Sequence, residues 1–402
     1  MDIKSDPSKH DGESMGQSSS AVDDSDSVHL ATTLPAEIIS DILIILPVKS
    51  LIRFKSVCKS WRALISDPIF VKAHLQGNIQ DKDYASHRLI MKTDTPHYDL
   101  KSCSLSSVLN EESSITCLDY PWEHPPRSIR IIGSVNGLVC IRVDLSLYTS
   151  LYIWNPSTGK AKRLPDYGST IYAEIISYGF GYDEANSDYK VVIIYLIIRP
   201  FDRSYNPQGK IYGLKSDSWR KIDDFYMRSQ LYAYCTFVSG SLNWAVSGGT
   251  ILSLDLSKET CSETELPFYL EEEMVCGNLG NLSGSLCQLS YVYGMMKIDL
   301  WVMKQFGKVE SWSKMYSIPY QCEIETFKNY ASLISSGKNK VLMLIGSVLM
   351  LYNLETKTVT HPDFQNLSNF LDVDAYIESL VSPDDASNNS IDEVIVEMVF
   401  IY

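Results

Sequence analysis

The feature that most limits how this chain can fold is an amphipathic helical run at residues 34–65, placed ahead of about 300 residues rich in short β-prone segments. Apolar side chains recur every three to four positions through residues 35–46 and again through residues 48–65. Pro35 suits the first turn of a helix, and Pro47 ends the first segment and begins the second. The pattern therefore predicts two amphipathic helices joined at a proline.

A third helical piece is expected directly afterwards. Asp67 and Pro68 have the residue types of an N-cap and a first helical position, and the piece extends to Leu75. Two or three helices of this size bury too little area to be stable alone. Their spare apolar surface must therefore meet either the rest of the chain, as a helical cap on a sheet domain, or another protein.

Charge limits the partners. The net charge of −14 argues against nucleic acid or an anionic membrane as the main partner, because both need basic surface. Against this acidic background, the helical run has five basic residues and no acidic residue between positions 49 and 62: Lys49, Arg53, Lys55, Lys59 and Arg62. This face is either solvated or a docking face for an acidic partner.

The remaining composition favours a non-catalytic protein of the cytoplasm or nucleus. Residues 1–29 are rich in Ser and Asp and have no apolar core, which predicts a disordered tail and no signal peptide. The longest apolar stretch, Val191–Ile198, is too short to span a bilayer. Nine cysteines without a CxxC pair are typical of reduced thiols. No metal or cofactor is predicted, since the histidines are scattered, and catalytic motifs such as GxSxG or HExxH are absent from the sequence.

From about residue 80 the sequence repeats a β-strand unit. A strand ends at Asn155, Asp255 or Asn353, about one hundred positions apart, and each of these residues is expected to start a tight turn. Between them lie segments marked by Trp219 and Trp312, whose rings are expected to pack between adjacent sheets. The interleaved spacing favours a propeller of about six kelch-like blades, with a β-sandwich as the alternative.

Five short motifs lie along the helical run: Leu34-Pro35, Leu46-Pro47, Lys49-Ser50-Leu51, Arg53-Phe54 and Val57-Cys58-Lys59-Ser60-Trp61. Together they closely resemble the F-box, over residues 30–75. Further motifs follow in the β-prone region: Ile132–Ile141, Ile153–Pro156, Tyr178–Asp183, Asp188–Val191, Ser218-Trp219 and Tyr376–Leu380. In this order they resemble the F-box-associated domain of a large plant family that includes S-locus F-box proteins.

The resemblance implies an α+β multi-domain protein, with a small helical F-box followed by an all-β propeller over residues 76–382. It also implies a substrate receptor of an SCF-type ubiquitin ligase that makes no bond itself. The F-box would bind a Skp1-type adaptor, and through it a cullin and a RING subunit. Eight residues are carried over for adaptor contact, several of which must also form the helical core: Leu34, Pro35, Ile38, Leu46, Pro47, Leu51, Val57 and Trp61.

The sequence does not indicate which protein the propeller would bind. A close S-locus relationship would make it a secreted stylar ribonuclease, an S-RNase, and a ligase-independent scaffold is the alternative function. Two variable loops, Arg199–Gln208 and Phe268–Glu273, are candidates for its binding site, although solvated loops would have the same composition. Ring closure is expected to pair residues 374–380 with a strand at residues 88–92. The C-terminal extension, residues 383–402, is expected to be an outer strand or an exposed tail.

Overall fold

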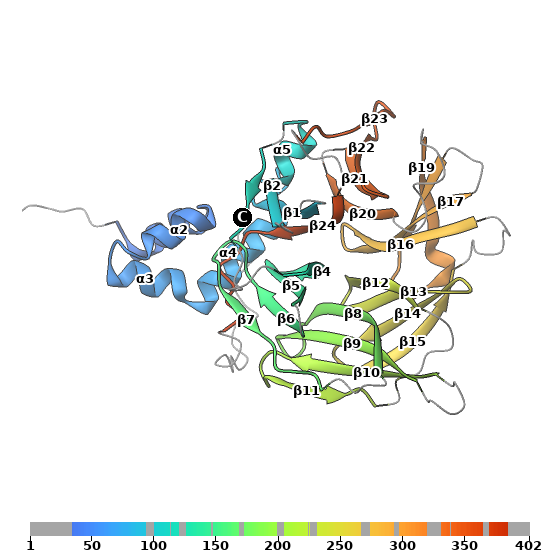
Figure 1. Cartoon of the computed structure of the whole chain (residues 1–402). Coiled ribbons are helices and arrows are strands. Elements are labelled where there is room, and N and C mark those ends of the chain that lie inside the picture. The colour runs from blue at the N-terminus through green and yellow to red at the C-terminus, as the bar shows by residue number, and fades with distance from the viewer. Residues whose placement is uncertain are drawn as a thin grey trace, which may run out of the picture.

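A computed structural model of the chain has a small helical domain followed by a six-bladed β-propeller (Figure 1). The structure describes residues 34–384 except residues 94–99, 113, 120–125, 146–147, 169–172, 199–204, 224, 226–230, 267–273, 293–296, 320–330, 338 and 365–369. The predicted disordered tail lies outside the described residues, as does nearly all of the predicted C-terminal extension. The predicted order of domains and the number of blades are confirmed.

The helical domain has four helices: α1 (Ala36–Ile44), α2 (Val48–Phe54), α3 (Lys59–Ser66) and α4 (Pro68–Gln80). The single helix expected over residues 48–65 is therefore wrong. Cys58 is extended, with φ −156°, and its Sγ accepts a hydrogen bond from the Trp61 amide, so it caps a new helix. The predicted cap of α4 is confirmed, because Asp67 Oδ1 accepts from the Ile69 amide at 2.8 Å.

Each blade is a four-stranded antiparallel sheet. Blade 1 combines β1 (His87–Thr93), β2 (Leu100–Ser104) and β3 (Thr116–Cys117) with β24 (Phe370–Ile377). Blade 2 contains β4 (Ser128–Val135), β5 (Leu138–Asp144), β6 (Thr149–Trp154) and β7 (Ala161–Arg163). Blade 3 contains β8 (Ala173–Asp183), β9 (Asp188–Ile198), β10 (Tyr205–Gly213) and β11 (Ser218–Lys221). Blade 4 contains β12 (Leu231–Val238), β13 (Ser241–Val246), β14 (Thr250–Asp255) and β15 (Thr260–Glu265). Blade 5 contains β16 (Met274–Leu282), β17 (Ser285–Val292), β18 (Lys297–Met303) and β19 (Trp312–Pro319). Blade 6 contains β20 (Ala331–Gly337), β21 (Lys340–Ile345), β22 (Val348–Asn353) and β23 (Val359–Thr360). Two short helices, α5 (Leu105–Leu109) and η1 (Val309–Ser311), lie between strands.

The ring closes where sequence analysis expected it. β24 pairs antiparallel with β1, in a register that places His87 opposite Ile377 and Lys92 opposite Asp372. The first strands of successive blades contact one another around the ring, from β4 through β20 and back by way of β24. The last strand of the propeller therefore completes the first blade, and one hydrogen-bonded sheet joins the two ends of the domain.

The predicted turn residues and tryptophans have the expected roles. The Oδ1 atoms of Asn155, Asp255 and Asn353 each accept hydrogen bonds from the backbone amides two and three residues further on. Trp312 is buried between blades 4 and 5, and Trp219 Nε1 donates to the Pro165 carbonyl, which follows blade 2. The blades thus adhere through apolar side chains from both partners, as a propeller requires.

Two carboxyl groups lie on β24, the strand of blade 1 that contacts β4. The Ile131 amide of blade 2 donates to Asp372 Oδ2 at 2.9 Å, so this carboxyl group bridges two blades. Burial raises the pKa of Asp372 to about 6. Burial and the neighbouring Asp372 carboxylate raise the pKa of Asp374 to about 7. An Asp in the unfolded chain has a pKa of about 3.9. The folded protein therefore binds more protons than the unfolded chain at pH values between this pKa and the raised pKa values of the two groups. The stability that these groups contribute is therefore lost as the pH rises through about 4 to 7.

This sign predicts that Asp374→Asn stabilises the protein at high pH only. We expect the free energy of unfolding to rise by about 2 kcal/mol at pH 8 and to change little at pH 4, where the wild-type carboxyl group is protonated in the folded state. Denaturant unfolding at both pH values measures the difference. Asp83→Asn, at an exposed position before β1, is the control. An equal effect of Asp374→Asn at both pH values would contradict the assignment.

Candidate protein-docking surface

The helical domain has a small core built from all four helices. Its buried members are Leu43, Val48, Leu51, Ile65 and Phe70, and half-buried apolar side chains pack around them. One further buried member, Leu380, comes from the chain after β24. The helices therefore do not form a closed core of their own, and the end of the propeller domain completes it.

A large apolar surface remains outside this core. Thirteen large apolar side chains are exposed in the described part of the chain, and eight of them lie in the helices or within two residues of a helix end: Leu34, Ile38, Ile42, Ile45, Ile52, Val57, Ile69 and Ile79. Ile45, at the end of α1, is 79% exposed. Exposed apolar groups gathered on so small a domain are typical of a protein-binding surface.

The eight residues predicted for adaptor contact divide into three groups. Leu34, Pro35, Ile38, Pro47 and Val57 are exposed and available to a partner. Leu46 and Trp61 are half-buried, and the Trp61 ring packs against Phe54 with 5.4 Å between ring centroids. Leu51 is fully buried and belongs to the helical core. The expectation that only some of the eight contact a partner therefore agrees with where their side chains lie.

Sequence analysis did not select Ile42, Ile45, Ile52 and Ile69, which are exposed in the same domain. The apolar stripe of α1 is broad, so its periodicity does not reveal which of its apolar residues are buried. Ile42 lies one helical turn after Ile38, and this spacing was the available signal. Only the packing of Leu43 into the core fixes the direction of the others.

The basic residues of the helical run are mostly solvent-facing. Lys49, Arg53, Lys59 and Arg62 are exposed, and Lys55 is half-buried. Arg62 Nε donates to the Lys55 carbonyl at 3.1 Å, which satisfies a carbonyl between α2 and α3. The positive charge therefore lies on the same small domain as the exposed apolar side chains.

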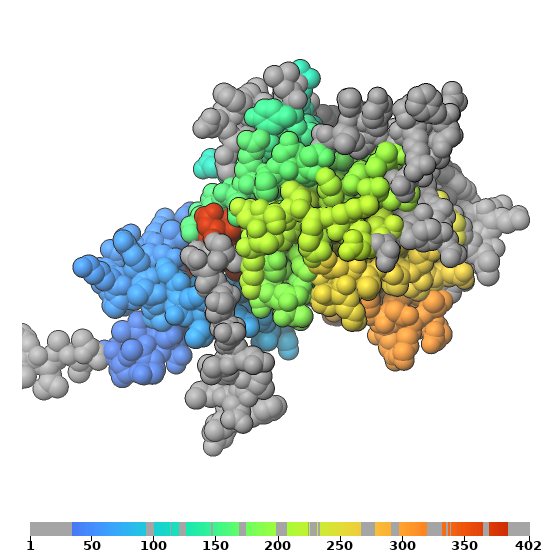
Figure 2. All heavy atoms as spheres, turned by 90° about the horizontal axis from the view of Figure 1, so that it is seen from below, coloured from blue at the N-terminus to red at the C-terminus, as the bar shows by residue number. Residues whose placement is uncertain are grey.

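Residues 378–382, which we call the joint segment, lie between the helices and blade 2; Figure 2 shows the end of the described chain in red between the blue helices and the green strands. On the helical side, Asn78 Nδ2 of α4 donates to the Glu378 carbonyl at 3.0 Å. On the blade side, Asn155 Nδ2 donates to the carbonyls of Ser379 at 2.9 Å and Val381 at 2.7 Å. The joint segment thus binds the docking surface to the propeller.

The joint is tightly packed as well as hydrogen-bonded. A Cβ on Gly137, whose φ is +80°, would lie 2.1 Å from Ser379 Oγ, so a larger residue does not fit in this turn of blade 2. Burial raises the pKa of Glu378, although Arg88 and Lys49 favour its charged form. Burial lowers the pKa of His74, whose Nε2 lies 2.9 Å from the Leu46 carbonyl. The joint segment thus fits closely against blade 2, and the His74 contact joins α4 to the turn between α1 and α2.

The two loops predicted to bind a target protein are largely outside the described residues. The structure describes Tyr205–Gln208 of the first loop, as the start of β10, and none of the second.

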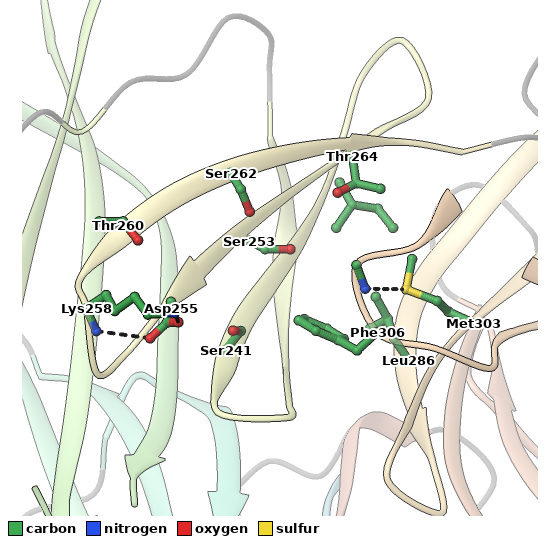
Figure 3. Close-up of a pocket in the computed structure, with 12 residues that line it drawn as sticks. Ser241, Ser253, Asp255, Lys258, Thr260, Ser262, Thr264, Leu286, Met303 and Phe306 are labelled. Atoms are coloured by element: carbon green, nitrogen blue, oxygen red, sulfur yellow. Dashed lines mark hydrogen bonds and ion pairs between the residues drawn. The ribbon is translucent and has the colours of Figure 1, made fainter. Parts of the chain in front are cut away.

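The described part of the propeller has a groove of about 230 Å³ between blades 4 and 5 (Figure 3). Hydroxyl groups from blade 4 line one side, and Leu286, Met303 and Phe306 of blade 5 line the other.

A metal-binding cluster of three or more His, Cys, Asp or Glu side chains is absent among the residues that the structure describes. No helix within the described ranges is long and apolar enough to cross a membrane.

The geometry defines a class of protein that has a helical docking domain fixed to a propeller. Residues 32–72 match the F-box domain model, and residues 89–383 match the model of the F-box associated beta propeller domain. An F-box/kelch-repeat protein of Arabidopsis thaliana is 35% identical over 368 residues, covering 88% of this chain and 96% of the relative. The F-box protein CPR1 of the same plant is 27% identical over 389 residues, covering 87% and 89%.

The chain belongs to the family of plant F-box proteins with an F-box associated beta propeller domain. The matched relatives are F-box proteins of Arabidopsis, which supports the wider family and does not single out the S-locus group.

Proposed function

We propose that this protein is the substrate-recognition subunit of an SCF-type ubiquitin ligase. The observation that carries the proposal is the exposed apolar surface of the F-box helices, which includes Leu34, Ile38 and Val57. A Skp1-type adaptor would cover this surface and connect the chain to a cullin and a RING subunit. The exposed basic residues Lys59 and Arg62 would meet acidic groups of the adaptor.

The proposed role is non-catalytic. The propeller would hold a target protein near an activated ubiquitin, so that transfer to a target lysine becomes effectively intramolecular. The joint segment supports this role, because it contacts both domains. Asn155 of the ring donates hydrogen bonds to its carbonyls, and its own Leu380 packs into the helical core. A fixed angle between the two domains would keep the target at one distance from the ubiquitin.

Reconstitution tests the proposal. The full chain, incubated with a purified plant Skp1-type adaptor, is expected to elute as a stoichiometric complex in size-exclusion chromatography and to recruit cullin and RING subunits. An adaptor that elutes separately would contradict the proposal and favour the alternative of a ligase-independent scaffold.

The resemblance to S-locus proteins supports a narrower proposal, in which the target is an S-RNase and the protein acts in self-incompatibility. We propose in addition that the protein works in the cytoplasm or nucleus, where cysteines stay reduced; seven cysteines are free among the described residues. Purified S-RNase tests the first proposal by direct binding, and a fluorescent fusion in plant cells tests the second.

A further inference from the structure

The outer strands of the six blades differ in how they are protected. β3, β7 and β23 have two or three residues, and β11 contains Arg220 and Lys221. β19 is long but contains Lys314 and ends at Pro319. Short length, charged side chains (above all Lys) and proline are the devices by which proteins keep a strand edge from pairing with other chains. β15, with six residues and the sequence TCSETE, has no basic residue and no proline, and its charged residues are Glu263 and Glu265.

Among the described strands, none pairs with the outward edge of β15. β15 is the last strand of its sheet, and its register with β14 runs without a bulge from Thr260 to Glu265. The Leu266 amide donates inward, to the Gly249 carbonyl at 2.7 Å. Because backbone groups alternate in direction along a strand, the amides and carbonyls of Glu263 and Glu265 point outward. These two residues therefore offer backbone groups that a further strand can pair with.

The two faces of β15 have different chemistry. Thr260, Ser262 and Thr264 face the groove between blades 4 and 5, where the exposed Phe306 stands across from them (Figure 3). Side chains alternate along a strand, so Glu263 and Glu265 lie on the opposite face. Both are exposed, and neither carboxylate has a hydrogen-bond or ion-pair partner within the described part of the chain.

These charges decide which occupant fits. A second copy of this chain that paired edge to edge would place its own Glu263 and Glu265 near those of the first, and like charges across a strand pair are destabilising. A strand with Lys or Arg at alternate positions would place opposite charges there instead. Its other face would place small side chains in the groove beside Ser262 and Phe306.

We propose that β15 and the groove beside it form a docking site for an extended segment of a partner protein, with basic residues at every second position. The segment would add a fifth strand to blade 4, with backbone hydrogen bonds supplying affinity and Glu263 and Glu265 selecting its sequence. The proposal extends the substrate-binding half of the proposed function. It predicts direct peptide binding by the full chain, which does not depend on adaptor capture and can fail separately from it.

A capped hexapeptide of alternating Thr and Lys is the probe, and fluorescence polarisation with the full-length protein is the measurement. We expect the wild type to bind this peptide. The double variant Glu263→Lys with Glu265→Lys should bind it at least about tenfold more weakly, because two attractive cross-strand charge pairs become repulsive. The same variant should gain binding of a hexapeptide of alternating Thr and Glu, because its new lysines attract the glutamates. Glu112→Lys with Glu184→Lys makes the same change in net charge at exposed positions outside β15 and is expected to leave affinity within about twofold.

The backbone part of the proposal has its own control. A Thr-Lys peptide that is N-methylated at alternate residues keeps its charge but cannot form the ladder, so we expect its binding to be lost. Equal binding of the methylated peptide, or an equal loss of affinity in both double variants, would show adsorption by charge alone and overturn the proposal. Absence of binding by the unmodified Thr-Lys peptide would also overturn it.

Discussion

Replacing Leu34 and Pro35 together with alanine is expected to abolish capture of a Skp1-type adaptor while the propeller stays folded. Leu34 is 55% exposed and Pro35 is exposed at the start of α1, so neither supports the helical core. Apolar anchors at the centre of an interface cost about 2 kcal/mol or more each when truncated. The double variant should therefore lose about a hundredfold or more in affinity.

Titration of the purified adaptor into the full-length variant measures this loss. Val348→Ala with Leu371→Ala is the matched control, because both side chains are 43% exposed on the propeller. The control should bind the adaptor as the wild type does. Undiminished capture by the Leu34 and Pro35 variant would remove the basis for placing the adaptor on this surface.

Replacing Asn155 with aspartate is expected to loosen the helical domain from the propeller. The turn at this position tolerates a carboxylate, since Asp255 forms the equivalent turn in blade 4. The side-chain amide of Asn155 also donates to the Ser379 and Val381 carbonyls, and an aspartate cannot. Asn155 is fully buried, so the variant places a carboxylate oxygen against the two carbonyl oxygens, at a cost of about 3 kcal/mol or more.

Asn353→Asp is the control for this effect. Asn353 accepts the same turn hydrogen bonds in blade 6. Among the described residues, it makes no hydrogen bond to the joint segment. We expect Asn155→Asp, and not Asn353→Asp, to speed proteolytic cleavage between α4 and β1 and to separate the melting of the two domains. Leu380→Ala should act in the same direction, because it removes a buried side chain from the helical core. A single unchanged melting transition in Asn155→Asp would contradict the role of the joint.

Much of the fold could be predicted because local rules specify it. The three turn residues about one hundred positions apart mark strand ends, and an Asn or Asp side chain folds back on the next amides wherever it occurs. The closing pair of β24 with β1 also followed from pattern, since a ring of blades must join its ends. The interruption of the second helix at Cys58 did not follow, because the apolar period continues through the break.

The candidate docking site was only partly predictable for a related reason. The motifs that resemble the F-box identified Leu34, Ile38 and Val57, which are exposed. They also identified Leu51, which is buried. Each is an apolar residue at helical spacing, and the choice between core and surface depends on what packs beside it. The groove beside β15 had no signal in the sequence, because its two sides come from different blades.

The sequence by itself determined the class of this protein: an F-box ahead of about six β-sheet units, in an acidic chain. Periodicity, turn chemistry and charge are properties of neighbouring residues, so they can be read without a structure. The tertiary structure alone decided that Leu380 completes the helical core, that Asn155 binds the joint segment, and that β15 is the last of the described strands in its sheet. These contacts join residues more than two hundred positions apart or depend on which strand lies last in its sheet, and only the closed ring brings such groups together.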